Sequence, residues 1–206
     1  MRNMLSVVVL IAMVIGLDQG LRGPDGAPGD LSSSTQSTLT TLYAHDPVQR
    51  SLSVNSGEPG MVMRPEGVFN RDTDIDFHSY RPGELSFGMQ GGSQAHITDL
   101  GSQRALADRY GYEETVGFGQ GFASIQVANG TVMIRGREDD QSLQPLVEAD
   151  MLLNAFDRTQ SSILPEVGHV YLLRLIEDRS TSIVKILVVA YRERESVTFR
   201  WERIDD

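Results

Sequence analysis

Three stretches near the carboxyl end decide the fold: HVYLLRLIED (169–178), TSIVKILVVAYR (181–192) and SVTFRWERI (196–204). They are rich in the β-branched and aromatic residues that suit a pleated, half-buried surface. The breaks between them, at Asp178–Ser180 and Glu193–Glu195, are short. Such links join only neighbouring antiparallel strands, because a parallel return needs a crossover of about a dozen residues or more. The sequence therefore predicts an antiparallel meander on which the rest of the fold packs.

The alternation of side chains within the meander predicts its buried faces. Phe199 and Trp201 fall on one face of the last stretch, and Arg200 falls on the other. We therefore expect Trp201, the only tryptophan, in the core. The middle stretch is apolar on both faces from Ile183 to Ala190 except at Lys185, which predicts a central strand covered on both sides.

A second hairpin is predicted upstream. The stretches FASIQVA and TVMIRGR flank Asn129-Gly130, which accepts the positive φ angles of a type I′ turn. This turn pairs Val127 with Val132 and Ile125 with Ile134. All four side chains then share one face, so the turn and the hydrophobic pattern agree.

The stretch DIDFHSY alternates strictly and predicts a strand with Ile75 and Phe77 facing inward and Asp74, Asp76 and His78 facing solvent. Four further elements follow from local signals. They are a turn at residues 81–83, a returning strand at 84–88, a strand at 95–100 and a helix at 103–110 capped by Ser102.

Helical spacing of apolar residues predicts another helix from Ser142 to Asp157, with Leu146 and Ala149 on its buried face. The predicted fold class is therefore mainly β, an antiparallel sheet or a two-layer β-sandwich with one or two short helices.

The amino-terminal third predicts export. Residues 1–16 combine Arg2 with the apolar run MLSVVVLIAMVIG, which is shorter than a membrane span and typical of a signal peptide. Gly16 fits the cleavage pattern loosely, so an uncleaved anchor stays an alternative. Residues 17–65 are Gly/Pro- and Ser/Thr-rich and predict a flexible linker. The globular domain is expected at residues 66–206.

Composition narrows the function classes. The formal net charge is −10, which argues against nucleic acid and against anionic membrane surfaces beyond the amino-terminal segment. The chain has no cysteine, which excludes disulfides, thiolate metal sites and cysteine catalysis.

One candidate metal site is the D-x-D-x-D run formed by Asp72, Asp74 and Asp76. Alternate carboxylates on a loop can supply oxygen ligands to Ca²⁺. The sixth and twelfth positions from Asp72 hold Phe77 and Gly83, where an EF-hand needs Gly and Glu. The simplest interpretation is therefore the solvated face of an edge strand.

Histidines offer a second candidate. His78 and His96 lie on predicted strands, and with Asp76 or Asp99 they could form a metal or acid–base site, as could His169. None of them has a local spacing that fixes such a geometry. No catalytic residue is assigned.

Three tyrosines, Tyr80, Tyr110 and Tyr112, are candidates for an exposed aromatic patch that would bind a protein or carbohydrate ligand.

The segments GHVYLL, KILVV and VTFRW, with Ile75–Phe77 and Asp99–Gly101 upstream, resemble a β-rich module of uncharacterised secreted bacterial proteins over residues 70–204. The resemblance implies a secreted β-fold and carries no catalytic or binding residue.

Together these features predict an exported, non-catalytic binding or structural module in the periplasm, at the cell envelope or outside the cell. The alternative is a secreted hydrolase or metal-dependent enzyme that uses Asp and His side chains on loops. A hydrolase predicts converging Asp and His groups with shifted pKa values, whereas a binding module predicts an exposed apolar or aromatic surface.

Overall fold

The computed structural model describes residues 37–60, 67, 73–88, 94–110, 125–135, 143–147, 149, 161–177 and 180–204. The chain divides into two units, Met1–Ser33 and Ser34–Asp206. All described residues belong to the second unit. They form three antiparallel sheets and one short helix, which confirms the predicted fold class.

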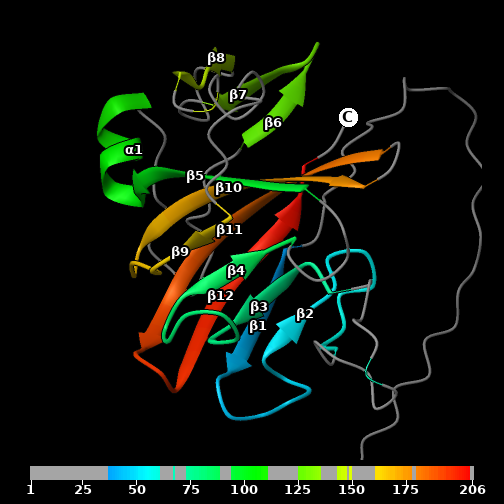
Figure 1. The fold of residues 1–206 in the computed structure, drawn as a ribbon. Coiled ribbons are helices and arrows are strands. Elements are labelled where there is room, and N and C mark those ends of the chain that lie inside the picture. The colour runs from blue at the N-terminus through cyan, green and yellow to red at the C-terminus, as the bar shows by residue number, and fades with distance from the viewer. Residues whose placement is uncertain are drawn as a thin grey trace, which may run out of the picture. The chain divides into compact units, whose positions relative to one another are not determined.

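The largest sheet has five strands in the order β1-β12-β11-β10-β5 (Figure 1). Its members are β1 (Thr38–Tyr43), β12 (Ser196–Arg203), β11 (Ser180–Arg192), β10 (His169–Glu177) and β5 (Gln94–Ser102). Strands β10, β11 and β12 are the predicted meander, and β11 is the central strand of the sheet. Each neighbouring pair is antiparallel, as the short links require.

Both faces of β11 are buried, as its sequence predicts. Val184, Ile186 and Val188 belong to one hydrophobic core, whereas Ile183 and Leu187 belong to another. The five-stranded sheet is therefore the middle layer between two cores. This arrangement requires the near-continuous apolar run of the strand.

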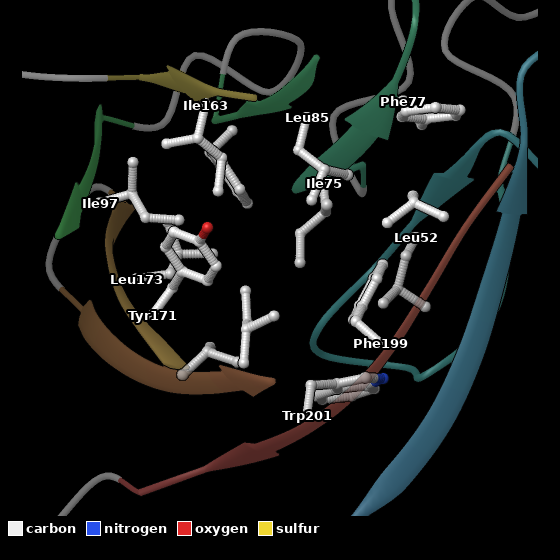
Figure 2. Close-up of a cluster of buried hydrophobic side chains, with 14 of the residues drawn as sticks. Leu52, Ile75, Phe77, Leu85, Ile97, Ile163, Tyr171, Leu173, Phe199 and Trp201 are labelled. Atoms are coloured by element: carbon white, nitrogen blue, oxygen red, sulfur yellow. The ribbon is translucent and has the colours of Figure 1, made fainter. Parts of the chain in front are cut away.

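A four-stranded sheet covers the first face. Its order is β2-β3-β4-β9, with β2 (Ser51–Leu52), β3 (Ile75–Phe77), β4 (Leu85–Phe87) and β9 (Ser162–Ile163). Side chains of the two sheets point toward one another in Figure 2, with Phe199 and Trp201 from β12 on one side and Ile75 and Leu85 on the other. Trp201 is buried, as predicted, and its Nε1–H donates to the Thr40 hydroxyl at 3.0 Å.

The second face meets helix α1 (Gln103–Tyr110) and a three-stranded sheet of β6 (Ile125–Ala128), β7 (Thr131–Arg135) and β8 (Leu143–Pro145). The hairpin of β6 and β7 has the predicted pairs, Val127 with Val132 and Ile125 with Ile134. Its turn residues Asn129 and Gly130 both have positive φ, as a type I′ turn requires. The Ser102 hydroxyl accepts the N–H of Ala105, which confirms the predicted helix cap.

The predicted start of the domain at residue 66 is wrong. Residues 38–43 form edge strand β1, and Leu42, Leu52 and Val54 are core residues. The composition of this region is polar because one face of β1 is exposed. Leu42, Leu52 and Val54 are the apolar side chains that this region contributes to the core. The predicted signal segment, residues 1–16, lies outside the described residues, and no helix in the described part is long and apolar enough to span a membrane.

The predicted helix from Ser142 to Asp157 also needs correction at its start. Residues Leu143–Pro145 pair with β7 as strand β8 instead. Val147 and Ala149 are helical, and Leu146 and Ala149 are buried as predicted. The tertiary pairing with β7 overrides the local helical spacing. Residues beyond Ala149 in this segment lie outside the described part.

Strand β1 allows a test of its place in the core. Leu42 and Leu39 lie on the same strand, with exposed fractions of 0% and 62%. We expect Leu42→Ala to lower the free energy of unfolding by about 2–5 kcal/mol, because it leaves a cavity. Leu39→Ala should change it by less than about 0.5 kcal/mol. Urea unfolding at low protein concentration measures both values, and equal effects would contradict the assignment of β1 to the core.

Candidate functional site

Three loops meet at one end of the sandwich, at the bottom of Figure 1. They are residues 44–50 between β1 and β2, residues 78–84 between β3 and β4, and residues 193–195 between β11 and β12. We call this surface the loop end. Backbone and side-chain hydrogen bonds tie the loops together: Ala44 N donates to Glu195 O at 2.9 Å, and Tyr191 Oη donates to Gly83 O at 3.1 Å.

The loops are also held from within. The Asp46 carboxylate accepts the N–H groups of Val48 and Gln49, each at 2.9 Å, and these two donors hold the pKa of Asp46 below its ordinary value. In the next loop, the Gly83 N–H donates to His78 Nδ1 at 2.9 Å. A surface whose loops are ordered before a ligand arrives loses less conformational entropy on binding.

Two histidines from different loops lie together at the loop end. The rings of His45 and His78 are 5.9 Å apart and edge-to-face. His78 has a φ of 66°, which is uncommon for a residue with a side chain. The hydrogen bond from the Gly83 N–H to its imidazole links the two ends of the turn and so stabilises this conformation. Sequence reasoning missed His45, since it lies in the segment predicted to be a linker.

Of the two predicted ligand-binding tyrosines that the structure describes, Tyr80 is exposed at the loop end, with 43% of its surface accessible. Partial burial raises the pKa of its phenol, and the nearby Asp76 carboxylate raises it further. Tyr110 is instead a core residue at the end of α1, so its prediction as part of an exposed patch is wrong. The apolar periodicity of the helix explains its burial. Tyr112 lies outside the described residues.

The predicted acidic run does not lie on a solvated face. Asp74 and Asp76 are both buried, and Asp74 Oδ2 accepts the Val54 N–H at 2.7 Å. Strand β3 lies between β2 and β4, so it is not an edge, and Asp76 is opposite the buried Ser51 and Ser86. Asp72 is outside the described residues. Within the described ranges, no group of three or more Asp, Glu or His side chains is placed to hold a metal ion.

His96 is separate from the loop end. It lies on β5, buried and opposite Arg174 of β10. Burial lowers the pKa of His96, and the Arg174 guanidinium lowers it further. His78 contacts His45, Phe77 and Gly83 instead. The structure thus does not bring His78 and His96, the two histidines predicted as metal ligands, into contact.

The structure does bring Asp99 to a histidine. His169 Nδ1 lies 2.9 Å and 3.2 Å from the two carboxylate oxygens of Asp99, and Nε2 lies 3.3 Å from Glu166 Oε2. A β-bulge opposite Val170 and Tyr171 turns Asp99 toward this position. We call Asp99, Glu166 and His169 the histidine cluster. Sequence reasoning missed Glu166, which lies in the turn before β10, where the His169 N–H donates to the Glu166 carbonyl at 3.2 Å.

Tyr171 contacts two members of the histidine cluster. Its hydroxyl accepts the Glu166 N–H at 3.0 Å, and its ring lies 6.2 Å from that of His169. Burial raises the pKa of Tyr171 to about 12, and the Asp99 and Glu166 carboxylates act in the same direction. The Glu166 N–H offsets part of this rise.

A buried ion pair joins β11 and β12 on the face of the five-stranded sheet that meets α1. Lys185 Nζ is 2.6 Å from Glu202 Oε1, and the lysine is 2% exposed. Burial lowers the pKa of Lys185, while the Glu202 carboxylate opposes the shift. The sequence marks Lys185 as the one charged residue in the apolar run from Ile183 to Ala190. Its pairing with Glu202 follows only from the strand register.

Comparisons with known proteins identified no relative of this chain. No protein-family model matches the sequence. A search of curated proteins also found no match.

Tyr171 makes a testable contribution to alkaline stability. A phenol whose pKa is raised on folding contributes stability that is complete below the unfolded value of about 10. That stability is lost as the pH rises toward about 12. We therefore expect Tyr171→Phe to unfold with a weaker pH dependence than wild type in this window. Urea midpoints at pH 9 and pH 11.5 measure it, with the exposed Tyr43→Phe as control. An unchanged slope in Tyr171→Phe would contradict the prediction.

Proposed function

We propose that this protein is an exported, non-catalytic binding module of the cell envelope or extracellular space, and that the loop end is its ligand-binding surface. The observation that carries the proposal is the convergence of three loops, held by hydrogen bonds from Ala44 to Glu195 and from Tyr191 to Gly83, with His45, His78 and Tyr80 on two of them. Binding residues commonly lie on loops that a rigid scaffold positions.

The side chains at this surface suit a ligand with both flat faces and hydroxyl groups. Tyr80 and the two imidazoles supply ring faces with polar atoms at their edges. Aromatic rings with polar tips recur where one side of a contact is apolar and the other is wet. We therefore favour a polysaccharide of the envelope over a protein as the ligand.

The histidine cluster favours one alternative, an acid–base hydrolase. An imidazole held by a carboxylate is the usual arrangement for a general base. Here Nε2 faces Glu166, and within the described residues no Ser or Thr hydroxyl is hydrogen-bonded to His169. The binding module is therefore the better supported function. Hydrolysis of p-nitrophenyl acetate that Asp99→Asn abolishes would support the hydrolase.

Sedimentation with insoluble polysaccharides tests the binding proposal. The probes are peptidoglycan, chitin and cellulose, each mixed with purified protein. We expect retention on at least one probe and about fivefold weaker binding for Tyr80→Ala, from the loss of one ring contact. Leu164→Ala is the control, because Leu164 is exposed, at 60%, and lies after β9, outside the loop end. Equal retention of the two variants would remove the loop end from the proposal.

Export is tested separately. The full chain, expressed in a bacterial host, should leave the cytoplasm and begin at Leu17 when its amino terminus is sequenced, because cleavage is expected after Gly16. Replacing Val8 and Leu10 by aspartate breaks the apolar run and should leave the protein in the cytoplasm uncleaved. Cytoplasmic accumulation of the wild-type chain would refute the export proposal.

A further inference from the structure

Strand β1 is an edge strand without the usual protection against pairing. Its sequence, TLTTLY, holds no charge, no proline and no bulge. Natural proteins protect their edges with such features or with very short strands. Among the other edge strands of the described sheets, β5 carries a bulge and Asp99, β8 ends in Pro145, β2 and β9 have two residues each and β6 has four.

The register shows which backbone groups of β1 face outward. Ala44 N donates to Glu195 O, so residues at even positions along β1 point their backbone groups toward β12. Odd-numbered residues point away. Tyr43 confirms this, because its N–H donates to Gln49 O and its carbonyl accepts the Asp46 N–H. Within the described part of the chain, Ser37, Leu39 and Thr41 therefore present outward backbone groups that no other strand meets.

We propose that this edge pairs with β1 of a second copy of the chain, as an antiparallel two-fold dimer with Leu39 on the symmetry axis. This register places Leu39 opposite Leu39 and Ser37 opposite Thr41. It uses the three outward residues of each copy and leaves the loop that occupies Tyr43 undisturbed. The dimer joins the two five-stranded sheets into one continuous sheet.

The chemistry of the strand favours a second copy as the occupant. A two-fold interface must be complementary to itself, and residues 37–41 contain no charge that would oppose its own counterpart. The absence of charge is important because two copies of a chain with a net charge of −10 repel each other elsewhere on their surfaces. Leu39 is the most exposed large apolar side chain of the described residues, at 62%, and it would pack against its symmetry mate. A contact of five residues is smaller than a standard interface, so the dimer forms at high concentration.

Single cysteines in this cysteine-free chain test the register. Residues directly opposite in a hydrogen-bonded antiparallel pair have Cα atoms about 5.5 Å apart, within the range of a disulfide. In full-length protein under mild oxidation, Leu39→Cys should form a disulfide dimer. Thr41→Cys should not, because its two copies would be about 14 Å apart along the strands. We expect at least a tenfold difference in the rate of dimer formation.

Leu164→Cys controls for random collision, since Leu164 is 60% exposed and lies in a loop after β9. Sedimentation equilibrium of the wild-type chain up to about 1 mM should show a monomer–dimer equilibrium. Leu39→Lys should abolish it through like charges at the axis, whereas Leu164→Lys should leave it unchanged. A wild-type chain that stays monomeric overturns the proposal. So do equal rates for Leu39→Cys and either of the other two cysteine variants.

Discussion

The structure depends on the burial of both faces of β11. Its even-numbered apolar side chains, Val184 to Val188, belong to the sandwich core, and its odd-numbered ones, Ile183 and Leu187, belong to the core beneath α1 and the three-stranded sheet. Lys185 interrupts the second set and is held by Glu202 of the neighbouring strand. Removing one member of such a pair leaves a buried charge, whereas replacing both by apolar groups often does not destabilise. The pair therefore favours one register of β11 against β12.

A sheet enclosed in this way is a rigid support for its loops. The loop end is built where β1, β3 and β11 reach the same end of the sandwich, and Tyr191 of β11 fastens the turn at Gly83. Gly83 has a φ of 81°, and a side chain there would approach the Tyr191 hydroxyl to 2.7 Å. The positive φ favours glycine at this position, and any other residue would also displace the Tyr191 hydroxyl. The positioning of His45 and His78 thus derives from the packing of the two sheets.

The histidine cluster likewise depends on pairing between strands, here on the bulge between β5 and β10. Asp99 follows a regular stretch of β5, and the bulge in its pairing with β10 directs its carboxylate to His169. Glu166 reaches the other nitrogen because Tyr171 holds its backbone. Neither a bulge nor a loop path is visible in hydrophobic periodicity. Residue types alone therefore identified Asp99 and His169 as candidates without pairing them, and missed Glu166.

By itself, the sequence determined the elements whose signals are local. Alternation identified the meander and the inward faces of Phe199 and Trp201, and Asn129-Gly130 determined its hairpin, because strand period and turn geometry depend on neighbouring residues alone. Tertiary structure decided what depends on residues far apart. It made Thr38–Tyr43 a strand by pairing it with β12, turned Leu143–Pro145 from helix to strand, and buried Asp74 and Asp76 within a sheet. In each case pairing with another segment outweighed the local preference, and such pairing leaves no periodic trace in the sequence.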